Sequence, residues 1–332
     1  MTANKKKIAQ NGIFTNVDYM EFVIGGAASC GAVCFSNPLE TVKTRMQLQG
    51  ELKAKGHYAV TYRNVFDAFI KIGRHEGLRS LQKGLSPALA YQLSLNGTRR
   101  GIYQAIVSAG FVETKPGGGT NLWASTMAGG VAGCISACIS SPWFMFKTQF
   151  QSEAASAIAV GHQRHYASLR QAVAQVVREQ GFKGLYRGAT GITIRVTCGS
   201  AAEMPSFALT KEFLDKYQIM AKGTFMNAAV SSIISGIAVT VAMCPFDVVT
   251  TRLYNQGLDA KGKGLLYDNF FDCVWKILKQ EGPFGFYKGF GALLFRLGPH
   301  TLLSLMLWDA MRVRYNRYKL RDLPSEEIKV KI

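Results

Sequence analysis

A short segment with a proline, an acid and two bases recurs three times, and this repetition constrains the fold more than any other feature. The first copy is residues 38–45, Pro-Leu-Glu-Thr-Val-Lys-Thr-Arg, and later copies begin at Pro142 and Pro245, 104 and 103 residues further on. Self-similarity at a fixed period is typical of a repeat architecture. We therefore predict one unit of three repeats, at residues 18–113, 120–219 and 222–318, with polar tails at 1–17 and 319–332.

Each copy ends an apolar segment without charged residues. These segments are residues 22–39, 121–146 and 223–246. A helix needs about 20 apolar residues to cross a bilayer, so all three are strong membrane-spanning candidates. The chain is 48% hydrophobic and still 18% charged, which suits membrane helices that enclose water.

Two further segments follow each proline copy. Short amphipathic stretches, predicted to lie along a membrane surface, occupy residues 62–76, 166–180 and 267–281. Weaker apolar segments with ionisable residues in the middle occupy residues 85–107, 189–211 and 290–312. Intramembrane charge is costly and should face water or a partner. The sequence thus predicts an all-α membrane protein with six spans in three pairs.

The overall charge narrows the classes of function. A net charge of +18 favours anionic substrates or an anionic membrane surface, and no zinc-finger, helix-turn-helix or RNA-binding signature accompanies it. The seven cysteines include no CxxC spacing, so no metal site is predicted. No nucleophile–base pair or glycine-rich nucleotide loop is visible, so we predict neither enzymatic activity nor a cofactor.

The complete pattern resembles the mitochondrial carrier family. It reads Pro-x-[Asp/Glu]-x-x-[Lys/Arg]-x-[Lys/Arg], then [Asp/Glu]-Gly-x4-aromatic-[Lys/Arg]-Gly, three times over about residues 18 to 318. Residues 245–256 and 295–301 look like the oxaloacetate-carrier branch of that family. The resemblance implies a six-helix pseudo-threefold bundle in the mitochondrial inner membrane, with a short matrix helix in each repeat. It also implies alternating-access exchange of small anions by a monomer.

The proline segments are implied to form a matrix gate, because the acid of one repeat meets the base of another. In the family's pairing order Glu40 pairs with Lys147, and Asp247 pairs with Lys43. The third pair would be Phe144 with Thr250, so both losses fall on one pair, and a gate of two ion pairs is predicted. The predicted gate residues are Pro38, Glu40, Lys43, Gln47, Pro142, Lys147, Gln151, Pro245 and Asp247.

The family's second gate, on the cytoplasmic side, is weakly represented. Its aromatic-acid-x-x-base pattern is complete only at residues 308–312, which contain Asp309 and Arg312. In the other repeats Gln104 and Lys211 are the remaining polar members, and they are predicted to pair by a hydrogen bond. We therefore expect a weak cytoplasmic gate.

The family's three substrate contact points lie seven residues after the repeated glycines, at Tyr91, Arg195 and Arg296. Two arginines at equivalent depth can clamp two carboxylates or a sulfur oxyanion by bidentate, charge-assisted bonds. Further along the same helix faces lie Arg99, Glu203 and His300. Arg195 or Arg99 can instead pair with Glu203, and His300 can carry a proton or simply pack.

Three glycines, Gly84, Gly188 and Gly289, open the second apolar segments, and each follows a basic residue. Free N–H groups there can bind lipid phosphate, and the resemblance implies cardiolipin; a plain turn is the alternative. The leading interpretation of the whole chain is an antiporter of dicarboxylates such as oxaloacetate, malate and malonate, and of sulfur oxyanions such as sulfate and thiosulfate. An uncoupling-type proton leak and a non-transporting scaffold remain alternatives.

Overall fold

Six long helices form the body of the protein. The computed structural model describes residues 19–53, 61–111, 122–218, 225–259 and 262–321. The long helices in these ranges are α2 (Tyr19–Leu48), α4 (Leu85–Ser108), α5 (Leu122–Ser152), α7 (Ala189–Lys216), α8 (Phe225–Asn255) and α10 (Phe290–Arg321). The predicted tail at 1–17 lies outside the described residues. Residues 319–321, predicted as tail, belong instead to α10, whose apolar and basic residues continue the helix.

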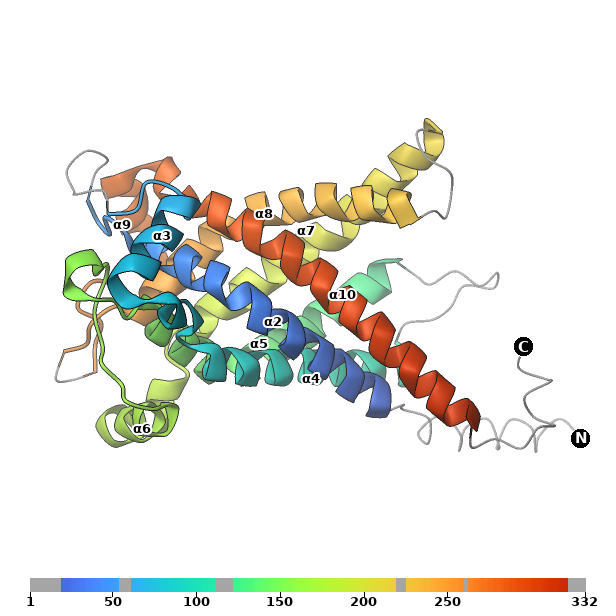
Figure 1. Cartoon of the computed structure of the whole chain (residues 1–332), viewed down its shortest axis with the longest axis horizontal. Coiled ribbons are helices and arrows are strands. Elements are labelled where there is room, and N and C mark those ends of the chain that lie inside the picture. Colours follow the sequence, from blue (N-terminus) through green and yellow to red (C-terminus); the bar gives the residue numbers. More distant parts are fainter. Residues whose placement is uncertain (1–18, 54–60, 112–121, 219–224, 260–261, 322–332) are drawn as a thin grey trace, which may run out of the picture.

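The long helices form a closed ring. Contacts run from α2 to α4, α5, α7, α8 and α10 in turn, and α10 returns to α2. The first helices of the three repeats, α2, α5 and α8, also contact one another. The start of α2 and the end of α10 lie toward the same end of the bundle (Figure 1). This is the predicted all-α bundle of three helix pairs.

Three short helices gather at the opposite end of the bundle, which we call the short-helix end (left in Figure 1). They are α3 (Val65–Glu76), α6 (Leu169–Leu185) and α9 (Phe270–Glu281), and 3-10 turns lie at Leu78–Gln82, Ser156–Ile158 and Pro283–Tyr287. Side chains of Asn64, Ser168 and Asn269 cap their first turns by accepting backbone N–H bonds. Ser, Asn and Asp are the residues that satisfy these otherwise free donors, so the helices start three residues later than the amphipathic pattern suggested.

The repeated prolines lie inside the helices. Pro38, Pro142 and Pro245 stand within α2, α5 and α8, and each helix continues for about ten residues beyond its proline. A proline inside a helix removes one backbone hydrogen bond and bends the axis. The charged residues that follow each proline are therefore helical, and they lie where α2, α5 and α8 contact one another.

Three segments are long and apolar enough to cross a membrane by length and composition: Thr126–Ser152, Ile233–Asn255 and Pro283–Tyr315. The first two match predicted strong spans. The third includes most of α10, for which the sequence predicts only a weaker membrane span. The search covered only the described residues, and α2 is not among the three segments found there.

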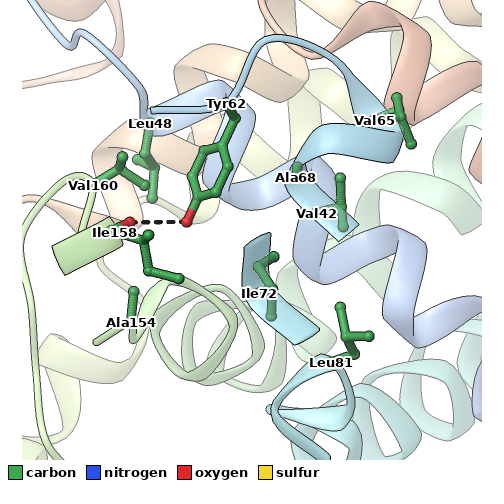
Figure 2. Close-up of a cluster of buried hydrophobic side chains, with 11 residues drawn as sticks. Val42, Leu48, Tyr62, Val65, Ala68, Ile72, Leu81, Ala154, Ile158 and Val160 are labelled. Atoms are coloured by element: carbon green, nitrogen blue, oxygen red, sulfur yellow. Dashed lines mark hydrogen bonds between the residues drawn. The ribbon is translucent and has the colours of Figure 1, made fainter. Parts of the chain in front are cut away.

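Each repeat has its own hydrophobic cluster beneath its short helix. Figure 2 shows the first, in which Val42 and Leu48 of α2 pack with Ala68 and Ile72 of α3. The hydroxyl of Tyr62 donates to the carbonyl of Ile158, 2.8 Å away, and so ties the second repeat to the first. Equivalent clusters lie under α6 and α9. The short helices are thus fixed to the bundle by buried apolar surface.

The repeated glycines allow the second long helix of each repeat, α4, α7 or α10, to start against a neighbouring helix. Gly188 has φ +82°, and a Cβ there would lie 2.9 Å from the ring of Tyr254. Gly84 meets Gln151 of α5, and Gly289 meets Gln47 of α2, each at 3.0 Å. Glycine is required both for the left-handed backbone and for the close approach. These contacts set the register between the second long helix of each repeat and the first helix of the next repeat.

We predict that Gly188→Ala destabilises the protein more than Gly110→Ala does. Both glycines have φ near +80°, which costs an alanine about 1–2 kcal/mol, but Gly110 faces open space and Gly188 faces Tyr254. The measurement is the midpoint of thermal unfolding in detergent. Gly129→Ala, with no contact and an ordinary helical backbone, serves as the neutral control. Equal losses at Gly188 and Gly110 would show that the contact with Tyr254 does not matter.

Candidate functional site

Two buried ion pairs join the first helices of the three repeats. The Lys43 ammonium lies 2.8 Å from the Asp247 carboxylate, between α2 and α8. Lys147 of α5 pairs with Glu40 of α2. All four side chains are buried. The structure therefore contains the two ion pairs expected from the pairing order, at the point where the three helices converge.

Two arginines complete this arrangement. Nε of Arg195 donates to Oδ1 of Asp247 at 2.6 Å, and a terminal nitrogen of Arg296 donates to Oε1 of Glu40 at 2.7 Å. Each carboxylate thus lies between a lysine and an arginine. We call the six side chains the ion-pair layer: Glu40, Lys43, Lys147, Arg195, Asp247 and Arg296. The sequence also allows Arg195 to pair with Glu203, but its carboxylate partner in the structure is Asp247.

The pairing of arginines with gate acids follows from the glycine register. Gly188, at the start of α7, touches Tyr254 of the antiparallel helix α8. Arg195 lies seven residues after Gly188, and Asp247 lies seven residues before Tyr254. Gly289 touches Gln47, and the same count leads to Arg296 and Glu40. Seven residues of helix span about 10 Å, so both partners reach the same depth. Sequence reasoning missed these contacts, although the spacing that produces them can be counted.

The third interface, between α4 and α5, has the same register but brings aromatic side chains together. Gly84 touches Gln151, and seven residues away lie Tyr91 and Phe144, whose ring centres are 5.1 Å apart. Phe144 also contacts Tyr254, with ring centres 5.6 Å apart. The guanidinium of Arg195 lies 4.9 Å from the centre of the Phe144 ring. In the second repeat Phe144 stands where the first and third repeats have Glu40 and Asp247. It faces Tyr91 instead of an arginine, so the contact between the two helices is aromatic.

Gln47 supports one ion pair directly. Its amide nitrogen donates to Asp247 at 2.7 Å, and its amide oxygen accepts from Thr251 at 2.9 Å. Gln151, at the equivalent position, bonds Thr44 and Asn37 instead. The two glutamines therefore fix the helices around the ion-pair layer in different ways.

The remaining predicted site residues lie further from the short-helix end. His300 contacts Ser36 through Nδ1 at 3.1 Å and Gln92 through Nε2 at 3.2 Å, so both ring nitrogens have polar partners. Arg99 is half-buried on α4. Asp309 and Arg312 are exposed, and Arg312 lies over the ring of Trp308. The side chains of Gln104, Glu203 and Lys211 lie outside the described residues.

Charge clusters lie between the ion-pair layer and the short helices in repeats 1 and 3. Arg45 binds Glu76 through two nitrogens, at 2.6 and 2.9 Å, and Lys83 lies 3.3 Å from Glu153. In repeat 3, Arg252 and Lys288 both pair with Glu281, at 2.5 and 2.6 Å, and Glu51 lies beside them. Two of the bases that precede the repeated glycines, Lys83 and Lys288, therefore have carboxylate partners inside the protein.

Comparison with known proteins agrees with this architecture. The sequence profile of the mitochondrial carrier protein family matches residues 17–110, 118–218 and 221–319. The chain is 50% identical to human solute carrier family 25 member 35 over 297 residues, which are 89% of this chain and 98% of that protein. It is 38% identical to the mitochondrial oxaloacetate transport protein of Saccharomyces cerevisiae, over 89% and 90% of the two chains. It is also 38% identical to the mitochondrial citrate transporter E of Aspergillus niger, over 93% and 97%.

The protein is therefore a membrane transporter built of three tandem helix pairs. It belongs to the mitochondrial carrier family, within the part that contains the oxaloacetate carriers. As a member of that family it is a multi-pass transporter of the mitochondrial inner membrane and not an enzyme.

We predict that Asp247→Asn destabilises the protein strongly. The change leaves Lys43 and Arg195 buried without their shared carboxylate, which typically costs about 3–5 kcal/mol. The midpoint of thermal unfolding in detergent should fall by many degrees. Asp309→Asn, which removes the same charge from an exposed position, should leave it nearly unchanged. Similar midpoints for the two variants would contradict a stabilising role of the ion-pair layer.

We predict that the buried carboxyl group of Glu51 makes the stability of the protein depend on pH. Burial raises the pKa of this carboxyl to about 7, although the nearby Arg252 opposes the shift. The folded state thus holds a proton that the unfolded chain releases at its ordinary pKa of 4.5, so stability falls as pH rises from 4.5 to about 7. Glu51→Gln removes this loss. Its unfolding midpoint should rise relative to the unsubstituted protein between pH 5 and 7 and then level off; a pH-independent difference would contradict the shifted pKa.

Proposed function

We propose that the protein exchanges small dianions across the inner membrane, and that the ion-pair layer is both the substrate site and the matrix gate. The observation that carries this proposal is a charge imbalance. The layer contains four cations, two lysines and two arginines, but two carboxylates, which leaves an excess of two positive charges. Dicarboxylates such as oxaloacetate, malate and malonate, and the oxyanions sulfate and thiosulfate, carry the complementary charge.

The arginines provide a route from binding to opening. Arg195 and Arg296 are each held by a single carboxylate, and Nε of Arg296 is a buried donor without an acceptor in the described part of the chain. A substrate carboxylate that binds these guanidinium groups competes with Asp247 and Glu40 for them. Each gate acid then keeps only its lysine. Binding thus weakens the closed layer and favours opening toward the matrix.

The aromatic interface of Tyr91 and Phe144 makes one side of the proposed site uncharged, whereas the two arginines make the other side positive. Tyr91 and Phe144 are nearly fully buried and bring no formal charge to the layer. A substrate with its charged groups on the two arginines therefore places its carbon chain or third oxygen near the third interface, where Tyr91 can donate a hydrogen bond. Arg99, Glu203 and His300 are proposed to guide the anion toward the layer, and Gln104, Lys211, Asp309 and Arg312 to close the cytoplasmic end.

The proposal includes a monomer that binds cardiolipin beside Gly84, Gly188 and Gly289. These glycines begin helices, and their position at the short-helix end supports lipid contact there. Exchange by one chain is consistent with a site formed wholly by its own six helices.

The proposed exchange is tested by uptake of labelled oxaloacetate, malate, sulfate and thiosulfate into proteoliposomes that are either empty or loaded with each anion. We expect uptake to require internal anion and to fall at least about 100-fold in Arg296→Ala, because the layer loses a bidentate anion contact. Arg170→Gln removes the same charge from the surface of α6 and should transport normally.

Other outcomes separate the alternatives. Proton uptake without anion exchange would replace the exchanger by a proton leak. No movement of any anion or proton by folded protein would favour a scaffold. Normal exchange in Arg296→Ala would show that the substrate site lies elsewhere.

A further inference from the structure

The contact between α5 and α8 lacks the ion pair that joins the other first helices. Phe144 of α5 stands where the other repeats have an acid, and Thr250 of α8 stands where they have a lysine. Thr250 donates to the carbonyl of Phe246 on its own helix, 2.6 Å away. Within the described residues, no ion pair joins α5 to α8. Other contacts must therefore hold these two helices together beside the ion-pair layer.

The hydroxyl group of Tyr254 makes such a contact. The hydroxyl oxygens of Tyr254 and Ser141 are 2.8 Å apart, so a hydrogen bond joins α8 to α5. Ser141 is 0% exposed and Tyr254 is 3% exposed. The bond is shielded from water, and a hydroxyl group that loses its partner there is left without a replacement. Separation of the two helices therefore has an energetic cost at this point.

Packing fixes the ring of Tyr254 on two sides. The ring centre lies 5.6 Å from that of Phe144, and a Cβ on Gly188 would lie 2.9 Å from the ring. The side chain of Gln149 on α5 also donates to the backbone carbonyl of Tyr254 at 3.1 Å. A side chain held in this way loses little further freedom when its hydroxyl group bonds to Ser141.

A hydrogen bond at the same position joins α2 to α5. In both contacts one partner directly precedes a repeated proline, and the other lies nine residues after the next repeated proline: Asn37 with Gln151, and Ser141 with Tyr254. The amide nitrogen of Gln151 donates to the amide oxygen of Asn37 at 3.0 Å. Between α2 and α5 this bond accompanies an ion pair of the layer, whereas between α5 and α8 it stands without one.

We infer that the hydrogen bond between Tyr254 and Ser141 is the third closing contact of the matrix gate, and that Tyr254 is a positioning residue for transport. The inference rests on the proposed function, in which the layer opens when α2, α5 and α8 separate. The bond adds no charge to the layer, so the excess of two positive charges is unaltered. Substrate releases the gate acids by competing for Arg195 and Arg296, but neither arginine takes part in this bond. It therefore resists opening both with and without substrate.

The first measurement is a double-mutant cycle on the unfolding equilibrium in detergent. Tyr254→Phe removes one hydroxyl group but keeps the ring, and Ser141→Ala removes the other. Each should raise the unfolding equilibrium constant about two- to tenfold, and the double variant should lose little more, because the same bond is lost only once. Tyr217→Phe removes the hydroxyl group of a tyrosine that is 61% exposed and should have no effect. Losses that simply add would show that the two hydroxyl groups do not interact.

The second measurement tests whether the bond acts on the gate. Ser152 of α5 is 1% exposed, and its hydroxyl oxygen lies 2.6 Å from the side chain of Asn255 on α8. After Ser152→Cys, an impermeant maleimide added at the matrix face should label residue 152 when α5 and α8 separate. Tyr254→Phe or Ser141→Ala in this background should raise the labelling rate about two- to tenfold, as read by mass spectrometry, and Tyr217→Phe should not. Equal rates in all these proteins would contradict a role in closing the gate.

The third measurement is the KM of the transported anion on each side of proteoliposomes in which the orientation of the protein is known. Loss of a contact made only in the closed gate raises the fraction of molecules open to the matrix. In Tyr254→Phe the matrix-side KM should therefore fall, and the cytoplasmic-side KM should stay the same or rise. A bond that serves only folding would lower the amount of active protein and change neither KM, and this result would refute the inference.

These outcomes separate the inference from the proposed function. If the unsubstituted protein exchanges no anion, the proposed function fails, and labelling of residue 152 still decides whether Tyr254 and Ser141 hold α5 against α8. If exchange is normal and depends on Arg296, but Tyr254→Phe changes neither the labelling rate nor either KM, the proposed function stands and this inference is wrong.

Discussion

The closed arrangement of the bundle depends on two buried carboxylates, each shared between a lysine and an arginine. Asp247 and Glu40 lie where α2, α5 and α8 converge, and their partners come from four different helices. A buried charge is tolerated only with such partners, so neither carboxylate can leave one cation without another taking its place. Under the proposed function, an incoming dianion replaces the two carboxylates at the arginines, and each carboxylate keeps its lysine as a partner.

The same layer shows why the threefold symmetry is incomplete. Two interfaces pair an arginine with an acid, and the third pairs Tyr91 with Phe144 at the same depth. An acid at position 144 would need a cation at the position of Tyr91 or Thr250, and neither is present. Loss of charge on both sides of the interface avoids an unpaired buried group. It leaves that interface dependent on aromatic packing.

Much of the fold could be predicted from the sequence. Three repeats, six long helices and three amphipathic helices follow from the period of the proline segments and from hydropathy, and the ion pairs of Lys43 and Lys147 follow from the pairing order of the family. The helix ends were less predictable, because Asn64, Ser168 and Asn269 cap the short helices after the amphipathic pattern has begun. The contacts of Arg195 and Arg296 needed the register between neighbouring helices, which is set by contacts of Gly188 and Gly289 that no single repeat reveals.

This register also limits how the proposed substrate site can change. Residues seven positions from each glycine contact are forced to face each other, so the contact-point residue and the gate acid must suit one another as well as the substrate. Arginine at the contact point requires an acid opposite it when no substrate is bound. Tyrosine permits phenylalanine, and because Thr250 also replaces the third lysine, the excess charge of the layer falls from three to two. Under the proposed function, the charge of the preferred anion is thus coupled to the number of lysines in the layer, and Lys43 and Lys147 leave an excess of two charges that suits dianions.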